Sequence, residues 1–395
     1  MKIRLNSNRI TERYQTDSTP LFGSIPTAHM FVMDGIGKWD SPYKWVGAWD
    51  EGKIIPFQEF NLTPDSDIFN YGAGLFEGGK FNKIDGKLYI WRPEMNAARM
   101  KRGANRIMLP SPSVEAQLAG YKTLIDIDRL YFPELKDGSP INGASGYIRP
   151  ILIGTEKKLG VKYGALARFA IYIKMGGPYF TDSIKLWLQD EYHRGINAGE
   201  AKLGGNYAMH VFPKAIGTSL GANEVLYLDY TKRFLRETGA SNIFVDKNWK
   251  ITFPPFGDGV LDSNTVKTFL ELRDYLAHEG VMIENQREFS LEELIDGIAS
   301  NEVTGMGCVG NAACVSPVKG LIIKKNSILH DKYVPTFSSM RRDGKIIDSP
   351  DSIELIIGNG QPSKASKTMY HTISGMQRGT IPAPEGWLKK IERIF

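Results

Sequence analysis

Short segments rich in β-branched and aromatic residues alternate with segments of helical periodicity, and this alternation constrains the fold more than any other feature. Helices are predicted after Pro93, Ser113, Asn206, Thr265 and Ser290, since proline suits a first helical turn and Ser290 opens its segment as a capping residue. The segments that predict strands are HMFVMD, KLYIWR, YIRPILIG, RFAIYIKM, IKLWLQ, EVLYLD, NIFVD and WKITF. The chain is therefore expected to be an α/β (mixed α+β) protein.

Composition excludes several classes of protein. With 42% hydrophobic and 24% charged residues over 395 positions, the chain has a globular composition and the length of about two to three domains. Its two cysteines, Cys308 and Cys314, are too few for a disulfide scaffold and lack metal-ligand spacing, so no metal site is expected.

Charge and hydropathy limit the partners. The net charge is +5, and no block of lysine or arginine typical of a nucleic-acid patch is present. No apolar run approaches the roughly 18 to 20 residues that a membrane-spanning helix needs. Residues 1–20 lack the apolar centre of a signal peptide. We expect small-molecule partners rather than nucleic acid or membrane, and a cytoplasmic location.

A domain boundary is predicted at residues 176–183. Gly176, Gly177 and Pro178 interrupt one strand segment, and the next begins at Ile184. We expect a smaller N-terminal domain over residues 1–175, an interdomain loop over 176–183, and a larger C-terminal domain over 184–395.

Lys202 is a candidate nucleophile. It lies in INAGEAKLGGNYA among small and apolar residues. A lysine that is desolvated has a lowered pKa, and its amine then attacks carbonyl groups to form a Schiff base. A surface lysine ahead of a glycine turn is the alternative that the window leaves open.

Glu237 is a candidate partner for a cofactor ring. It precedes a run of small polar residues in RETGASNIFV. A carboxylate at this position could hold a pyridine nitrogen in its protonated form, which makes the ring an electron sink. A solvated turn would explain the same residues.

Two turns of small residues are candidate anion sites. The segment FGDGVLDSNTVK runs through Asn264 and Thr265 into a predicted helix, whose first amides could bind an anion. The second turn, Gly310 to Ala313, offers amides and the Asn311 side chain. Glycine and asparagine also favour tight loops without any ligand.

Two arginines in the N-terminal half are candidates for burial. Side chains of a β-strand alternate between its two faces, so Tyr147 and Arg149 in YIRPILIG are expected on the same face. An inward arginine needs an anion, which a substrate carboxylate or a structural glutamate could supply. Arg99 is flanked by alanines in a helical segment, so its side of the helix could be the buried one, and the spacing allows a solvated arginine equally well.

Together these segments resemble one family. FNYGAGLFEGGK, YIWRPEMNAARMKRGANRIMLP, YIRPILIGTEKKLGV, KLGGNYA, EVLYLD, ETGASNIFV and NAACVSPV are similar to segments of the branched-chain amino acid aminotransferases, in the same order, from about residue 28 to residue 320. This class IV aminotransferase family has the two-domain fold of fold-type-IV enzymes that depend on pyridoxal 5′-phosphate. The resemblance implies transamination of L-leucine, L-isoleucine and L-valine with 2-oxoglutarate, by a homodimer or a larger homo-oligomer.

The resemblance also implies roles for individual residues. Lys202 would form the Schiff base with the cofactor and act as the catalytic proton carrier. Glu237 would pair with the pyridine nitrogen and Tyr207 with the phenolic oxygen. The phosphate would be held by Arg99, Asn264, Thr265 and Asn311. The substrate side would be lined by Tyr71, Phe76, Tyr147, Arg149, Ala240 and Ala312.

The chain departs from the family pattern at three positions near these residues. Asn311 replaces the usual threonine of the second phosphate turn. Asp262 stands where the family commonly has proline, which places an acid close to the expected phosphate. Ala240 replaces a threonine and removes a hydroxyl from the substrate side.

Two alternatives remain open. Another fold-type-IV enzyme, such as a D-amino acid aminotransferase or an aminodeoxychorismate lyase, would share the lysine chemistry. A divergent non-catalytic relative that binds the cofactor would share the fold without the reaction. The chirality of the accepted amino donor separates the first alternative, and the reaction of Lys202 with the cofactor separates the second.

Overall fold

The computed structural model describes residues 2–5, 22–42, 44–136, 139–140, 145–177, 182–195 and 198–394. These residues form two compact units. Unit 1 takes its residues from 1–179, 201–205 and 374–395, and unit 2 from 180–200 and 206–373. Part of the predicted interdomain loop, residues 178–181, lies outside the described residues. The predicted loop and domain bounds stay predictions.

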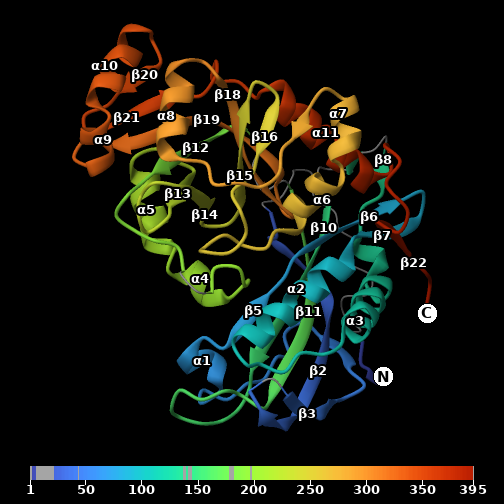
Figure 1. The fold of residues 1–395 in the computed structure, drawn as a ribbon. Helices are drawn as coiled ribbons and strands as arrows, with labels where there is room; N and C mark the ends of the chain where they lie inside the picture. Colours follow the sequence, from blue (N-terminus) through green and yellow to red (C-terminus); the bar gives the residue numbers. More distant parts are fainter. Residues whose placement is uncertain are drawn as a thin grey trace. The chain divides into compact units, whose positions relative to one another are not determined.

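Unit 1 is built on a ten-stranded sheet in the order β1-β4-β2-β11-β10-β6-β7-β22, with β3 paired to β2 and β5 to β10 (Figure 1). Its strands are β1 Lys2–Ile3, β2 Ile25–Ser41, β3 Lys44–Trp49, β4 Lys53–Pro56, β5 Gly74–Phe76, β6 Gly79–Ile84, β7 Lys87–Trp91, β10 Ser145–Gly154, β11 Ala167–Gly176 and β22 Leu388–Ile391. A separate two-stranded sheet pairs β8 Leu135–Lys136 with β9 Ser139–Pro140.

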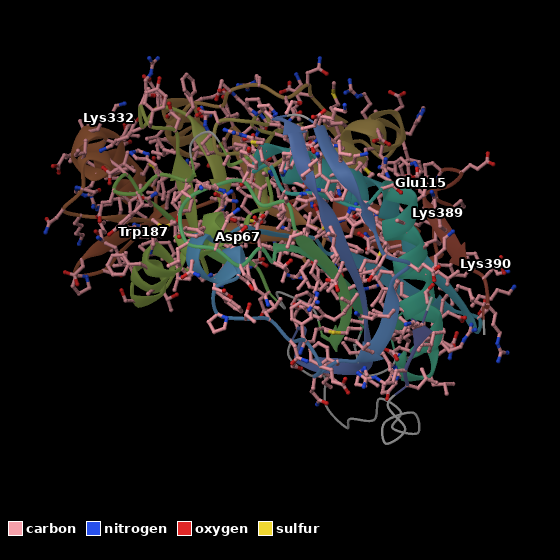
Figure 2. The ribbon with its side chains drawn as sticks, turned by 90° about the horizontal axis from the view of Figure 1, so that it is seen from below. Asp67, Glu115, Trp187, Lys332, Lys389 and Lys390 are labelled. Atoms are coloured by element: carbon pink, nitrogen blue, oxygen red, sulfur yellow. The ribbon has the colours of Figure 1, made fainter. Side chains whose placement is uncertain are left out.

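Two long helices cover this sheet. α2, Pro93–Arg106, and α3, Val114–Ile127, lie side by side, and α3 contacts β2 and β11. Ser113 caps α3 by accepting a hydrogen bond from the Ala116 N–H. Glu115 in its first turn is exposed, and hydrogen bonds to its own backbone N–H and to Ser113 lower its pKa (Figure 2). The short helix α1 spans Asp67–Tyr71, and a 3-10 turn spans Arg129–Tyr131.

Unit 2 has its own ten-stranded sheet, in the order β14-β13-β12-β19-β18-β15-β16-β17, with β21 paired to β19 and β20 to β21. Its strands are β12 Ile184–Leu188, β13 Glu224–Leu228, β14 Leu235–Thr238, β15 Asn242–Lys247, β16 Lys250–Thr252, β17 Met282–Ile283, β18 Val303–Gly310, β19 Cys314–Lys324, β20 Ile346–Asp348 and β21 Ser352–Ile356. β13 and β19 flank β12 in parallel, so the centre of the sheet is buried on both faces. Trp187 on β12 is 1% exposed (Figure 2).

Most of the remaining helices belong to unit 2. They are α4 Gly204–Ala208, α5 Val211–Ser219, α6 Asn264–Glu271, α7 Arg273–His278, α8 Leu291–Ala299, α9 Ile328–Lys332, α10 Val334–Arg342 and α11 Lys364–Arg378. The chain crosses between the units within α4 and within α11. Ser290 caps α8 by accepting from the Glu293 N–H, as its sequence predicted.

The structure confirms the predicted mixed α/β fold, and each predicted strand segment contains an observed strand. Two helix predictions differ in detail. The helix predicted after Asn206 is observed as two helices, α4 from Gly204 and α5 from Val211. α6 begins at Asn264 with Ser263 as its cap, and α7 follows after a break at Leu272. Within the described residues, no helix is long and apolar enough to cross a membrane.

Candidate active site

Lys202 lies beside an aromatic ring of unit 1. Its backbone oxygen accepts a hydrogen bond from the Phe76 N–H at 3.1 Å, and Leu203 pairs with Leu75 as an isolated bridge. These contacts place the Lys202 Nζ 4.7 Å from the centre of the Phe76 ring. The side chain is half-buried, so the amine combines a partly apolar environment with access for a ligand.

The same ring contacts Arg149. Its guanidinium carbon lies 4.8 Å from the centre of the Phe76 ring and 5.4 Å from that of Tyr147. The prediction that Tyr147 and Arg149 share one face of β10 is confirmed by the second distance. A Cβ at Gly78 would lie 1.8 Å from the Tyr147 Oη, so the chain needs glycine there to admit the phenol. Lys202 and Arg149 thus share one aromatic surface.

Tyr71, the remaining predicted substrate residue of unit 1, lies at the end of α1. Its side chain is partly exposed, and its hydroxyl accepts a hydrogen bond from the Gly160 N–H. The contact ties the end of α1 to the segment after β10. Within the described residues, Tyr71 makes no ring contact with Phe76.

Arg99 belongs to a buried cluster that we call the unit 1 cluster: Arg99, Glu77 and Asn96. The Arg99 Nε donates to Glu77 Oε1 at 2.6 Å and its Nη2 to Oε2 at 2.8 Å. Asn96 donates to the same Oε2 at 2.9 Å. The predicted burial of Arg99 is confirmed, since it is 5% exposed. A bidentate fork of this kind fixes the guanidinium plane.

Glu237 belongs to a second cluster, the unit 2 cluster: Glu237, Arg194 and Asn242. Glu237 Oε1 lies 2.5 Å from Arg194 Nε, and Oε2 accepts from Asn242 Nδ2 at 2.7 Å. Glu237 is 1% exposed, so the solvated turn considered from the sequence is wrong. Its charge is compensated within the fold.

Arg194 connects Glu237 to Tyr207. Its guanidinium carbon lies 5.5 Å from the centre of the Tyr207 ring, and its Nη1 donates to the Gly239 oxygen at 2.7 Å. Burial acts to lower the pKa of Arg194, but Glu237 and Tyr207 outweigh it and hold that pKa above its ordinary value. The arginine therefore stays charged between these two predicted cofactor residues.

The first turn of α6 has the features of an anion site. Ser263 caps the helix, and the first N–H groups of a helix have no acceptor within it. Asn264 is 5% exposed, and neither its Nδ2 nor its Oδ1 has a hydrogen-bond partner in the described part of the chain. The Thr265 hydroxyl donates to Asn311 Oδ1 at 3.0 Å, which joins the two predicted phosphate turns.

The other departures from the family pattern also have local partners. Asp262 forms an ion pair with Lys267, one turn into α6, so its charge is partly offset. Ala240 lacks a hydroxyl, but its N–H donates to Thr238 Oγ1 at 3.3 Å. Ala312 lies half-buried in the turn between β18 and β19.

Comparisons with known proteins decide the family. The family described as Amino-transferase class IV matches residues 74–321. The chain belongs to the class IV amino-transferases. Branched-chain-amino-acid transaminase 1 of Bacillus subtilis is 30% identical to it, and the match covers 97% of this chain and 100% of that protein. The predicted family resemblance and aminotransferase class are confirmed.

Solved structures share the fold of this aminotransferase. The branched-chain aminotransferase of the archaeon Thermoproteus uzoniensis, solved with norvaline, has a TM-score of 0.67 at 20% identity, over 86% of this chain and 97% of that one. The enzyme from Thermobaculum terrenum in its PLP form has a TM-score of 0.66 at 15% identity, over 93% and 99%. These likenesses confirm the predicted two-domain fold class.

The residues present fit pyridoxal phosphate. Unit 2 supplies a buried carboxylate for a ring nitrogen, and the first turn of α6 contains the buried Asn264 amide, which has no partner among the described residues. Unit 1 supplies the Lys202 amine and the Arg99 cation. Free helix amides with a nearby hydroxyl suit a phosphate, and a compensated carboxylate suits a protonated ring nitrogen. Each unit by itself therefore offers donors that suit part of the cofactor.

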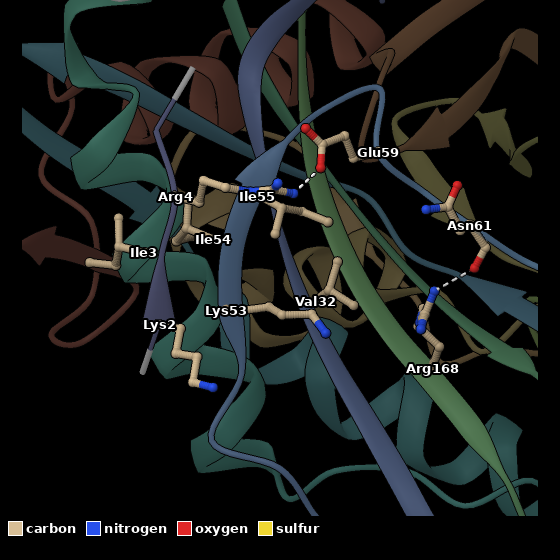
Figure 3. Close-up of a pocket in the computed structure, with 10 residues that line it drawn as sticks. All are labelled: Lys2, Ile3, Arg4, Val32, Lys53, Ile54, Ile55, Glu59, Asn61 and Arg168. Atoms are coloured by element: carbon tan, nitrogen blue, oxygen red, sulfur yellow. Dashed lines mark hydrogen bonds and ion pairs between the residues drawn. The ribbon is translucent and has the colours of Figure 1, made fainter. Parts of the chain in front are cut away.

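A cavity of about 420 Å³ lies elsewhere in unit 1 (Figure 3). Its lining is Lys2, Ile3, Arg4, Val32, Lys53, Ile54, Ile55, Glu59, Asn61 and Arg168. Arg4 pairs with Glu59, and Arg168 donates to the Asn61 oxygen and pairs with Asp34 at 2.6 Å. None of the predicted site residues lines it, so this cavity is not the candidate active site.

Sequence reasoning missed the partners that hold the predicted residues. Arg194 and Asn242 gave no local signal, because they meet Glu237 only through the folding of unit 2. Glu77 gave a weak signal, since it is the only acid in the glycine-rich stretch YGAGLFEGGK. A buried acid in such a stretch requires a cation nearby.

Proposed function

We propose that this enzyme transfers the amino group of L-leucine, L-isoleucine or L-valine to 2-oxoglutarate, with pyridoxal 5′-phosphate as its cofactor. The class IV family supports the cofactor, and the Bacillus subtilis relative supports the substrate class. The observation that carries the proposal is the Phe76 ring, which contacts both Lys202 at 4.7 Å and Arg149 at 4.8 Å. An apolar surface with one cation suits an aliphatic substrate and an acidic co-substrate in turn.

Bound pyridoxal phosphate supplies the electron sink that lets the α-proton of the amino acid leave. Lys202 would hold the cofactor through Nζ until the amino acid displaces it, and the freed Nζ amine would then take the α-proton and return it.

The unit 2 cluster holds the charge that the ring nitrogen requires. Asn242 donates a hydrogen bond to one oxygen of Glu237 and Arg194 forms an ion pair with the other, so the carboxylate would be held in place before the cofactor binds. Tyr207, placed against Arg194, would donate its hydroxyl proton to the phenolic oxygen of the cofactor. Arg99, the first turn of α6 and Asn311 would bind the phosphate.

Substrate recognition is assigned to the surface around Phe76. Phe76 and Tyr147 would receive the aliphatic side chain, with Tyr71, Ala240 and Ala312 as further contacts. Arg149 has only ring contacts in the described part of the chain, so its guanidinium hydrogen-bond donors are open to a ligand. We assign it the second carboxylate of 2-oxoglutarate, which an aliphatic substrate lacks.

We further propose that the enzyme is a cytoplasmic homodimer or larger homo-oligomer. Sedimentation of the purified protein measures its assembly, and a monomer at micromolar concentration would contradict this part of the proposal. Fractionation of the source cells measures the location. The reaction itself requires only small-molecule partners.

The test of the function is a half-reaction. Purified protein with pyridoxal phosphate is mixed with L-leucine in the absence of any keto acid, and the absorbance of the bound cofactor is followed. Conversion to the aminated cofactor is expected with L-leucine and not with D-leucine. Lys202→Ala should lose the absorbance band of the lysine-bound cofactor.

Three outcomes contradict specific parts of the proposal. Conversion by D-leucine alone would point to a D-amino acid aminotransferase. Binding of the cofactor without conversion by any amino donor would point to a non-catalytic relative. An Arg149→Met variant that keeps its KM for 2-oxoglutarate would remove the assigned role of Arg149.

A further inference from the structure

His210 of unit 2 has a polar partner on each ring nitrogen. It lies immediately before α5, and its Nδ1 is 2.6 Å from the Tyr227 hydroxyl. Its Nε2 is 2.6 Å from Glu224 Oε1. Both partners lie on β13 and are 3% exposed. A carboxylate, an imidazole and a phenol thus form a continuous chain of hydrogen bonds that fixes the plane of the imidazole.

Charged side chains near the His210 imidazole act on its two partners, Glu224 and Tyr227. Lys214 on α5 lies 3.2 Å from the second oxygen of Glu224. Burial raises the pKa of Tyr227, and the positive charge of Arg194 acts against that rise. Burial acts to raise the pKa of Glu224, but His210, Lys214 and the Val225 N–H outweigh it and keep that pKa below its ordinary value. Glu224 therefore stays ionised and holds the ring.

The fixed imidazole packs on the backbone of Gly239. A Cβ at Gly239 would lie 1.8 Å from His210 Nε2 and 1.9 Å from its Cδ2, so the ring occupies the space of that side chain. The Gly239 oxygen meanwhile accepts from Arg194 Nη1 at 2.7 Å. The backbone at Gly239 is thus held by the imidazole and by the arginine that also pairs with Glu237.

Gly239 stands between two residues of the proposed site. Glu237 precedes it by two positions on β14, and Ala240 follows it directly. A shift of the Gly239 backbone would therefore move both the Glu237 carboxylate and Ala240. Misplacement of reacting groups by about 1 Å can lower the rate of the catalysed reaction by about a hundredfold.

We propose that His210 is a positioning residue of the transamination. Glu224 and Tyr227 hold its imidazole against the Gly239 backbone, and this contact fixes the positions of the Glu237 carboxylate and Ala240. The proposal rests on the function proposed above. His210 touches neither substrate nor cofactor, and it acts through Gly239.

The test is a double-mutant cycle between His210 and Gly239. Gly239→Ala pushes a methyl group into the imidazole, whereas His210→Ala removes the imidazole and opens that space. The backbone at Gly239 is outside the left-handed region, so alanine adds no backbone strain there and its methyl group clashes with the imidazole. Each single variant should lose about tenfold to a hundredfold in kcat. Gly239→Ala should cost less than about threefold more when His210 is already alanine.

Readouts other than turnover separate positioning from mere stability. The absorbance maximum and pyridoxal phosphate dissociation constant should change in both single variants, because the carboxylate opposite the ring nitrogen has moved. His210→Gln keeps a donor and an acceptor and should restore most of kcat. His278→Gln, at an exposed histidine of α7, is the matched control and should behave as wild type.

Two results would overturn the inference. Both single variants could keep kcat and cofactor spectrum within twofold of an active wild type, or their effects could multiply in the double variant. An inactive wild type would contradict the proposed function instead. Cofactor affinity and spectrum of the variants would then still decide the role of His210.

Discussion

Among the described residues, each unit of the molecule buries an arginine–glutamate–asparagine cluster, and the two differ in which member is proposed to bind the cofactor. In both clusters the arginine Nε pairs with one glutamate oxygen and the asparagine amide donates to the other. The unit 1 arginine donates two hydrogen bonds to its glutamate, whereas the unit 2 arginine donates to the backbone oxygens of Gly259 and Gly239. The proposed cofactor residue is the arginine in unit 1 and the glutamate in unit 2.

The comparison shows that a buried ion pair can hold either of its partners ready for a ligand. The partner that does not bind the ligand supplies the compensating charge, without which the other would be costly to bury. In the proposed roles, the bidentate unit 1 pair would orient a cation for an anionic phosphate, and the unit 2 pair would orient an anion for a cationic ring nitrogen. Composition alone therefore does not reveal which member binds.

The largest expected effect comes from removing the charge that compensates Glu237. Arg194→Met leaves a carboxylate buried without its cation and should lower the free energy of unfolding by about 3–5 kcal/mol. Urea unfolding of the apoprotein measures it. The double variant Arg194→Met/Glu237→Gln should recover part of this loss, since neither charge remains. A loss below about 1 kcal/mol in the single variant would show that the unit 2 pair does not support the fold.

The corresponding substitution in unit 1 should lower the free energy of unfolding by less, and its effect should depend on whether phosphate is bound. Glu77→Gln removes the charge but keeps an acceptor for Arg99, and we expect a loss of about 2–3 kcal/mol. Because the uncompensated Arg99 then prefers an anion, inorganic phosphate should raise the unfolding temperature of this variant more than that of wild type. Equal shifts in the two proteins would argue against a phosphate role for Arg99.

A third buried carboxylate, Glu224, has an imidazole in place of the arginine. Glu224→Gln should lower the unfolding free energy by about 1.5–3 kcal/mol at neutral pH. The pKa of Glu224 is lowered in the folded state, so its contribution is present above the unfolded value of about 4.5 and is lost as pH falls through the folded value. Unfolding from pH 7 to pH 3 should show the two proteins converging. A constant difference across that range would contradict the assigned ionisation.

Sequence reasoning reached one member of each cluster and missed the other two. The flanking alanines made Arg99 a candidate for burial, and the segment RETGASNIFV made Glu237 a candidate, which the family resemblance strengthened. Glu77 is 22 positions from Arg99, and Arg194 is still further from Glu237, so no local pattern links them. The strand segments could be predicted because each one contains the apolar residues that it buries in its own sheet. Pairing across the sheet depends on topology, which single-segment patterns do not contain.

Helix ends show the same limit on a smaller scale. Ser290 was predicted as a cap and is one, because the capping signal is local. The helix predicted after Thr265 instead begins at Asn264, capped by Ser263. The break at Leu272 also went unseen, since the apolar periodicity continues through it.

The smallest expected effect comes from the Asp262–Lys267 pair, which resembles the buried clusters in charge and differs from them in exposure. The side chains are 20% and 31% exposed, so water and salt screen their attraction. Asp262→Asn should change the unfolding free energy by less than about 1 kcal/mol. Because it removes an acid beside the first turn of α6, affinity for pyridoxal phosphate should rise by about twofold to fivefold at low salt, and the gain should shrink in about 1 M salt. Titration of the apoprotein at two salt concentrations measures both. An unchanged affinity at low salt would mean that Lys267 already neutralises the charge of Asp262. A gain in affinity that persists at high salt would mean that Asp262 is as poorly screened as the buried carboxylates.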